Sequence, residues 1–147
     1  MPSGGGIRVN AMIDSDALVN WDSFSQARTE LGANFVRILG YFREDGIKSV
    51  SRIEEAMRNQ SAAGLVIPAH TLKGEARQFG ADRLGDLAEE IETLARLCVE
   101  RQDTPSNVLE KVVTLRPVFE STLKLLEREA NPLVERRPGF GRRTLAG

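Results

Sequence analysis

The sequence predicts an all-α protein, an up-down-up-down four-helix bundle with one or two short N-terminal helices packed on it. Apolar residues recur three or four positions apart in four long segments, whereas the alternation typical of β-strands is nearly absent. Capping residues and helix breakers leave only short turns between the segments, and short turns place consecutive helices antiparallel. The chain of 147 residues is long enough to form one domain around one core.

The first helices are expected between residues 14 and 31, as one or two short elements that lie on the bundle. The four long helices are expected at residues 33–59, 62–79, 81–101 and 105–129, and their four apolar stripes can close one core. The apolar positions that define these segments are Leu18, Trp21, Phe24, Ala27, Leu31; Phe35, Leu39, Phe42, Gly46, Val50, Ile53, Met57; Leu65, Ala69, Leu72, Ala76, Phe79; Leu84, Leu87, Ala88, Ile91, Leu94, Ala95, Cys98; and Val108, Val112, Leu115, Phe119, Leu126.

Local signals at the segment ends agree with these helices. Ser61 can cap the second long helix, and Gly80 follows Phe79 as a residue able to take a positive φ. Thr104 before Pro105 is the pattern of an N-cap with proline at the first helical position, so we expect the last helix to begin there.

Two prolines conflict with the helical segments. Pro68 and Pro117 fall inside them, and an internal proline removes one hydrogen bond and clashes with the carbonyl four residues back, at a cost of ~3 kcal/mol. For Pro68 that residue is Gly64, whose flexibility can absorb a kink. We therefore expect bends in these helices rather than breaks.

The chain is divided into three parts by its charge and its breakers. Residues 1–12 contain three consecutive glycines and are expected to be a flexible leader, and residues 13–130 form the bundle. Residues 131–147 carry four arginines against one glutamate, so we expect a basic, disordered tail. Two interpretations of this tail stay open: a solubilising end, or a basic arm for a partner or nucleic acid.

Composition limits the kinds of site that the chain can hold. Its 20 basic and 21 acidic side chains leave a net charge of −1, which gives no general attraction to nucleic acid or to an acidic membrane. One cysteine and one histidine exclude an internal disulfide and argue against a zinc centre. Cys98 lies on a core stripe and is expected to be inert packing rather than a reactive thiol. With no apolar run of 18 residues and no signal peptide, we expect a cytoplasmic protein.

The single histidine, His70, is expected to point away from the core into solvent. At about 100° per residue, the apolar positions of its helix fall on the opposite side. Gly74 lies about 40° from His70, Arg77 about 20° and Lys73 about 60°. This exposed face therefore presents an imidazole, two cations and a residue without a side chain.

Each of these groups has a chemical use. A neutral imidazole nitrogen is a nucleophile near pH 7, and Lys73, one turn from His70, can neutralise a phosphoryl group on that nitrogen. Gly74 leaves room for a partner, while Val66 and Ile67 can form an apolar docking rim beside Arg77. On spacing alone, a solvated basic surface with a packing glycine stays an open interpretation.

Residues 69–74 read Ala-His-Thr-Leu-Lys-Gly and are followed by Phe79-Gly80-Ala81 and Leu84. This pattern resembles the signature of histidine phosphotransfer (HPt) domains, and the resemblance covers roughly residues 33–129. It implies a four-helix bundle whose exposed His70 exchanges a phosphoryl group with the aspartate of a response-regulator receiver domain. By the same resemblance, Lys73 is the electrostatic partner of His70 and Gly74 the clearance residue.

The sequence departs from the usual HPt signature at two positions. Pro68 lies two residues before His70 and is not part of the signature. Many members carry a glutamine 22 residues after the histidine that hydrogen-bonds the imidazole, and this chain has Glu92 there. A carboxylate at 92 could orient the imidazole but would repel a bound phosphoryl group, so a solvated helix charge is the alternative interpretation of Glu92.

The resemblance also implies the partners. These are response-regulator receiver domains, with a hybrid sensor histidine kinase as a further candidate, and the Mg²⁺ of the transfer belongs to the receiver. The chain needs no cofactor of its own, and because it has no nucleotide-binding loop we expect a phosphoryl carrier that does not phosphorylate itself from ATP.

Two other functions stay open. One is a helical adaptor without chemistry, which binds partners through Val66, Ile67 and the basic tail. The other is a dimerisation and phospho-acceptor fragment of a sensor histidine kinase. Such fragments usually contribute two helices to a dimer and carry an acidic residue after the histidine, whereas Thr71 follows His70 here. Four helices in one chain favour a monomer.

Overall fold

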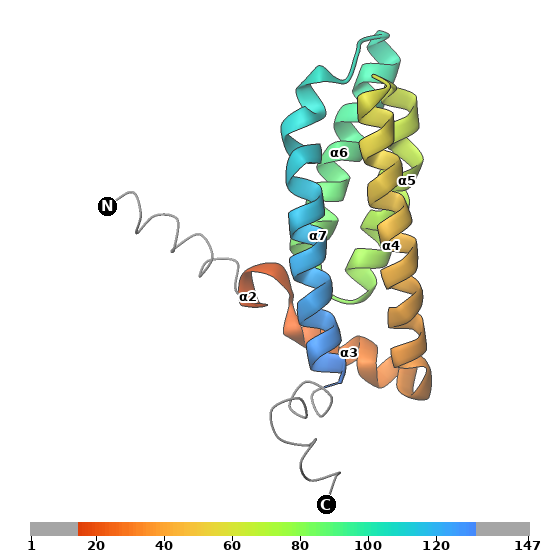
Figure 1. Cartoon of the computed structure of the whole chain (residues 1–147). Helices are drawn as coiled ribbons and strands as arrows, with labels where there is room; N and C mark the ends of the chain where they lie inside the picture. The colour runs from red at the N-terminus through yellow and green to blue at the C-terminus, as the bar shows by residue number, and fades with distance from the viewer. Residues whose placement is uncertain (1–14, 132–147) are drawn as a thin grey trace, which may run out of the picture.

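The computed structural model describes residues 15–131, which contain helices and no strand. The long helices lie side by side in a bundle, with a short helix across one end (Figure 1). In chain order the elements are α2 (Ser15–Leu18), α3 (Trp21–Leu31), the 3-10 turn η1 (Gly32–Asn34), α4 (Phe35–Arg58), α5 (Ala62–Gln78), α6 (Asp82–Arg101), the 3-10 turn η2 (Ser106–Val108) and α7 (Leu109–Ala130). The predicted all-helical class is confirmed. The predicted leader and all but the first residue of the predicted tail lie outside the described residues.

The bundle is closed by contacts between its first and last long helices. α5 packs on α4 and on α6, α7 packs on α6, and α4 and α7 also contact one another. Only residues 59–61 join α4 to α5, and only residues 79–81 join α5 to α6. The α5–α6 contact is the most extensive in the bundle, and it is this contact that brings His70 close to residues far along the chain.

The predicted stripes form one core. All positions of the four long stripes are buried except Leu94, which is half-buried, and Trp21 and Leu31 of the short N-terminal helix are also half-buried. Ring-to-ring contacts link the N-terminal helix to the far side of the bundle, in the order Trp21, Phe24, Phe35, Phe79, Phe42 and Phe119. Cys98 is buried, which fits inert packing.

Helix ends agree with the sequence in two places and differ in one. The Ser61 hydroxyl accepts a hydrogen bond from the backbone N–H of Gly64 at 3.0 Å, and Gly80 has φ +76°. The prediction for Thr104 and Pro105 is wrong, because α7 begins only at Leu109. The carbonyl of Pro105 instead accepts from the N–H of Val108 at 2.9 Å, so the chain makes one 3-10 turn before α7.

Neither internal proline ends its helix. α5 continues from Ala62 to Gln78 through Pro68, and α7 continues from Leu109 to Ala130 through Pro117. The expectation that these prolines would not break their helices is confirmed. Pro68 is buried, so its ring packs into the bundle while His70, two residues later, lies on the surface.

Candidate functional site

His70 lies on the side of α5 that faces away from the core. Ala69 and Leu72 on either side of it in sequence are completely buried, whereas the His70 side chain is 59% exposed. The apolar stripe of α5 fixes this orientation because it must face the core. The ring is therefore accessible from solvent, while the buried residues on either side of it pack in the core.

Glu92 on α6 reaches the imidazole from the neighbouring helix. Its Oε2 lies 3.0 Å from Nδ1 of His70. Glu92 is only 6% exposed, although its position in the sequence is that of a polar helix residue. The interpretation of Glu92 as a solvated helix charge is therefore wrong: the close α5–α6 packing covers this side chain.

Two cations flank the Glu92 carboxylate. Lys73 Nζ forms an ion pair with Oε1 at 2.9 Å, and the Lys73 side chain is 22% exposed. Arg96, one turn further along α6, donates from Nε and Nη2 to Oε2 at 3.1 and 2.8 Å. The carboxylate is thus shared by three side chains, one of which is the imidazole.

These contacts determine the ionisation of Glu92. Burial by itself raises the pKa of the Glu92 carboxyl, but the hydrogen bonds from Lys73, Arg96 and His70, together with the charge of Lys73, outweigh burial and lower the pKa to about 2. Near neutral pH the carboxylate can only accept hydrogen bonds. Nδ1 of His70 therefore carries a proton, and the lone pair of the neutral ring resides on Nε2.

Nε2 is the ring nitrogen that remains available to a reactant. Among residues 15–131 no hydrogen bond to this nitrogen is found. Gly74, one turn along α5, is exposed, and a Cβ built there would meet no atom within 4 Å. Gly74 is therefore not a packing glycine, and the space beside the ring is free.

The predicted docking residues divide into two groups. Ile67 is 66% exposed, while Val66 is half-buried and packs partly on the core. The Arg77 guanidinium is engaged within the chain, where Nη2 lies 3.0 Å from Asp86 Oδ1 and 2.6 Å from Glu89 Oε1. Arg77 therefore joins α5 to α6, and Ile67 is the more accessible apolar residue near His70.

Arg96 was not among the residues singled out from the sequence. Its only local signal is its spacing, since Arg96 follows Glu92 by four residues and such pairs contact one another on a helix. That signal is weak because Arg96 has the same spacing to Glu100. The burial of Glu92 distinguishes the Glu92–Arg96 pair from the Arg96–Glu100 pair.

The described residues hold neither a metal cluster nor a membrane span. Within residues 15–131 no group of three or more His, Cys, Asp or Glu side chains could hold a metal ion. None of the helices in this range is long and apolar enough to cross a membrane.

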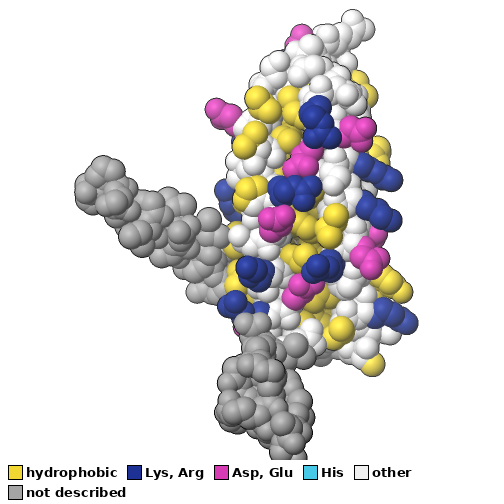
Figure 2. Space-filling model, viewed as in Figure 1, with side chains coloured by type: hydrophobic (Ala, Val, Ile, Leu, Met, Phe, Trp, Pro, Cys, Tyr) yellow, Lys and Arg dark blue, Asp and Glu magenta, His cyan; other side chains and the backbone are white. Residues whose placement is uncertain are grey.

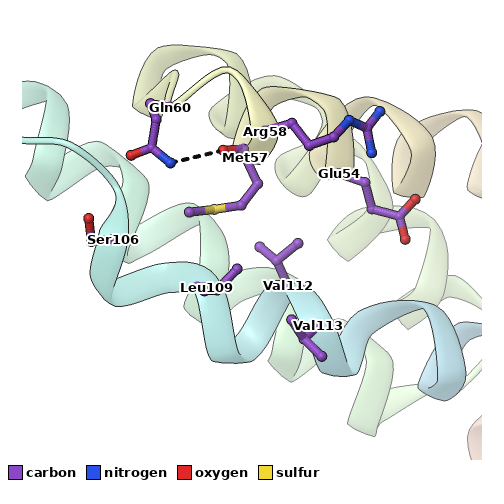
Figure 3. Close-up of a pocket in the computed structure, with 8 residues that line it drawn as sticks. All are labelled: Glu54, Met57, Arg58, Gln60, Ser106, Leu109, Val112 and Val113. Carbon is purple, nitrogen blue, oxygen red and sulfur yellow. Dashed lines mark hydrogen bonds between the residues drawn. The ribbon is translucent and has the colours of Figure 1, made fainter.

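A surface groove lies away from His70. It is formed by the C-terminal half of α4, the turn η2 and the start of α7, as Figure 3 shows. Met57 and Val112 form its floor, and Leu109 and Val113 are half or more exposed at its edge.

On the face of the bundle formed by α4 and α7, apolar patches alternate with basic side chains (Lys and Arg) and with acidic side chains (Asp and Glu) (Figure 2).

Comparison with known proteins gives one match. The family model described as Hpt domain matches residues 37–129, which is more than half of the chain. Comparison with curated proteins and with solved structures gives no match. The matched residues run from α4 into the last turn of α7 and include the whole α5–α6 contact.

Proposed function

The chain belongs to the Hpt domain family, and on this premise we propose that it relays a phosphoryl group between His70 and the aspartate of a response-regulator receiver domain in a two-component phosphorelay. One observation carries the proposal. The exposed ring of His70 has Nδ1 held 3.0 Å from a buried carboxylate and Nε2 without a partner among the described residues. That arrangement suits a nucleophile supplied to a partner's site.

The transfer proceeds by in-line attack of Nε2 on phosphorus. The lone pair of Nε2 forms the new P–N bond while the P–O bond to the receiver aspartate breaks, and its electron pair stays on the aspartate oxygen. Lys73 offsets negative charge on the phosphoryl oxygens. Gly74 leaves space for the receiver to approach, and Glu92 orients the imidazole through Nδ1.

The remaining parts of the reaction are supplied by the partner. We propose that Mg²⁺ and the phosphoaspartate belong to the receiver domain, and that this chain acts as a phosphoryl carrier without ATP-dependent kinase activity. Ile67 and Val66 form the apolar side of the docking surface. A hybrid sensor histidine kinase is a further candidate partner, and the proposed location of the relay is the cytoplasm.

We propose that the protein acts as a monomer with an up-down-up-down order of helices. Figure 1 places the α4–α5 and α6–α7 connections at one end of the bundle and the α5–α6 turn at the other. Contacts of α4 with α7 close the core of the described residues within one chain. This supports the monomer over a kinase dimerisation fragment, and sedimentation at micromolar concentration would test it.

The α4–α7 groove favours the second candidate function, a helical adaptor without chemistry. Leu109 and Val113 are exposed there by 50% and 66%. A binding role through this groove would leave His70 unused, so the two functions are separable by experiment.

The relay is tested by His70→Gln. The glutamine has a similar size and no nucleophilic nitrogen, and because the side chain lies on the surface the helical signal in far-UV circular dichroism should not change. Incubation with a phosphorylated receiver should give acid-labile phosphate on the wild-type protein and none on the variant. Uptake by the variant at the wild-type rate would exclude His70 as the acceptor and leave the adaptor as the better proposal.

A further inference from the structure

The carboxylate beside the imidazole poses an electrostatic problem for the phosphorylated state. Glu92 Oε2 lies 3.0 Å from one ring nitrogen, and a phosphoryl group on the other nitrogen would bring two more negative charges to the same ring. A neutral amide at this position would avoid the repulsion. A buried carboxylate at 92 therefore needs a compensating effect within the site.

Part of the compensation comes from the cations. The charged groups that face the ring are Lys73 on its own helix and Glu92 and Arg96 on α6. Among the described residues, α3 and α4, which also pack on α5, contribute no ion pair to the ring. With a neutral ring the cluster has one negative and two positive charges, so it favours the arrival of an anionic group.

The other part concerns the ring itself. When Nε2 takes up a phosphoryl group, its lone pair enters the P–N bond, and a ring that keeps the proton on Nδ1 becomes a cation. That cation is 3.0 Å from Glu92 Oε2, and an opposite charge at such a distance favours the charged form. With a cationic ring and a dianionic phosphoryl group, the charges of the whole cluster cancel.

Protonation of the ring decides how readily the phosphoryl group departs. When the P–Nε2 bond breaks, its electron pair returns to the ring. From the protonated ring the leaving group is neutral imidazole, whereas from the deprotonated ring it is an imidazolate anion, which is a far poorer leaving group. The acceptor, a carboxylate or a water oxygen, forms the new P–O bond in the same step.

We propose that Glu92 keeps the ring of phosphorylated His70 protonated at Nδ1, so that the site holds a phosphoimidazolium that remains a strong phosphoryl donor as the pH rises above neutrality. This inference rests on the proposed function, since it requires that His70 be the acceptor. It assigns to Glu92 an electrostatic role in the loaded state in addition to orienting the free ring.

The experiment loads the full chain chemically and follows the ring directly. Phosphoramidate transfers its phosphoryl group to histidine with loss of ammonia, so no receiver is required. Because the chain has a single histidine, ¹⁵N NMR reports the two nitrogens of His70 without overlap. In the phosphorylated protein, we expect Nδ1 to lose its proton at a pH at least about 1 unit higher in the wild type than in Glu92→Gln.

The lifetime of the phosphoryl group should follow the same difference. A shift of one pH unit changes the protonated fraction about tenfold above both midpoints, so at alkaline pH the wild type should lose phosphate to water about tenfold faster than Glu92→Gln. Glu90→Gln is the matched control, because Glu90 lies two residues away, is exposed and pairs with Lys111 instead of His70. Its titration and lifetime should equal those of the wild type.

A second variant should shift the Nδ1 titration in the opposite direction. Arg96→Gln removes a cation that pairs with Glu92, so Nδ1 should lose its proton at a higher pH than in the wild type. This variant tests the inference even if Glu92→Gln does not fold. Equal titrations in wild type and Glu92→Gln, or a downward shift in Arg96→Gln, would overturn the inference. Failure of the loaded wild type to pass phosphate to any receiver would instead contradict the relay, and the ring titration would be unaffected.

Discussion

The contacts of α5 with α6 and with α4 each hold a carboxylate, and the neighbours of these two groups drive their pKa values in opposite directions. On the side of α6, burial and the contacts of Lys73, Arg96 and His70 together bring the pKa of Glu92 to about 2. On the side of α4, burial raises the pKa of Glu75, and Asp45 adds to this, so that it reaches about 7. Burial disfavours the charged form on both sides, so the neighbouring charges decide the sign.

Glu92 and Glu75 thus show two different effects of neighbouring charge in one bundle. The α5–α6 contact supplies cations to an acid and thereby holds a fixed negative charge beside His70. The α4–α5 contact places two acids together, and Oε1 of Glu75 is buried without a hydrogen-bond partner among the described residues. The first arrangement is the one on which the proposed relay depends, whereas the second lowers stability at neutral pH.

The largest expected effect on stability comes from Glu92→Ala. Because the folded pKa is lowered from 4.5 to about 2, the wild-type carboxylate stabilises the fold above about pH 4.5, and this contribution is lost as the pH falls toward 2. We expect Glu92→Ala to reduce the free energy of unfolding at pH 7 by on the order of 2–3 kcal/mol. Denaturant unfolding of the wild type and the variant at pH 7 and pH 3 measures this difference in the free energy of unfolding.

The control for Glu92→Ala is Glu90→Ala. Glu90 is 52% exposed in its ion pair with Lys111, so its removal should cost no more than about 1 kcal/mol. If the two variants lost equal free energy of unfolding, or if the loss in Glu92→Ala persisted at low pH, the stabilisation by Glu92 would not be electrostatic.

Lys73→Ala tests the same cluster through the reaction. Lys73 is proposed to stabilise phosphoryl charge, and one charge-assisted contact is worth ~1.5–3 kcal/mol, or roughly 10- to 150-fold in rate. Transfer from a phosphorylated receiver should slow by that factor, or the phosphohistidine lifetime should shorten, with little change in receiver affinity. Lys111→Ala removes a similar ion pair to α6 and should transfer at the wild-type rate; an equal slowing in both would point to a general loss of charge.

Glu75→Gln tests the opposite side of α5. A folded pKa raised from 4.5 to about 7 means that the unfolded chain ionises first, so wild-type stability falls as the pH rises from about 4.5 to 7. The variant lacks this loss and should be more stable than the wild type at pH 8 by on the order of 1–2 kcal/mol, with little difference at pH 4. Asp45→Asn should give the same sign, and a pH-independent difference would assign the effect to packing.

The smallest effect on stability is expected from Gly74→Gln. Glutamine is the better helix former by roughly 0.5–1 kcal/mol, and no atom lies within 4 Å of the added Cβ, so the melting temperature should rise slightly. Receiver docking should weaken because the side chain fills the space beside His70. Gly40→Gln is the control, since Gly40 on α4 is equally unobstructed; it should stabilise without changing docking. If Gly74→Gln melted lower and docked normally, the clearance role would be wrong.

Local sequence pattern was sufficient for the helices, the core stripes and the exposure of His70. Each of these depends on periodicity within one helix, and a stripe of apolar residues must face the core whatever its neighbours are. The bonds that end these helices are equally local, since Ser61 accepts from the N–H of Gly64 and the N–H of Gly80 donates to the carbonyl of Arg77. The start of α7 could not be predicted in this way, because Pro105 entered a 3-10 turn in the longer connection from α6.

Only the tertiary structure decided what surrounds His70. The burial of Glu92, its sharing between Lys73 and Arg96, and the binding of Arg77 within the chain all depend on the register between α5 and α6. The sequence by itself determined which residues each helix presents, since that follows from a rise and rotation common to all helices. The packing of two helices determines which charged side chains lie together across their contact. In the buried contacts of this bundle, that packing sets the direction of each pKa shift.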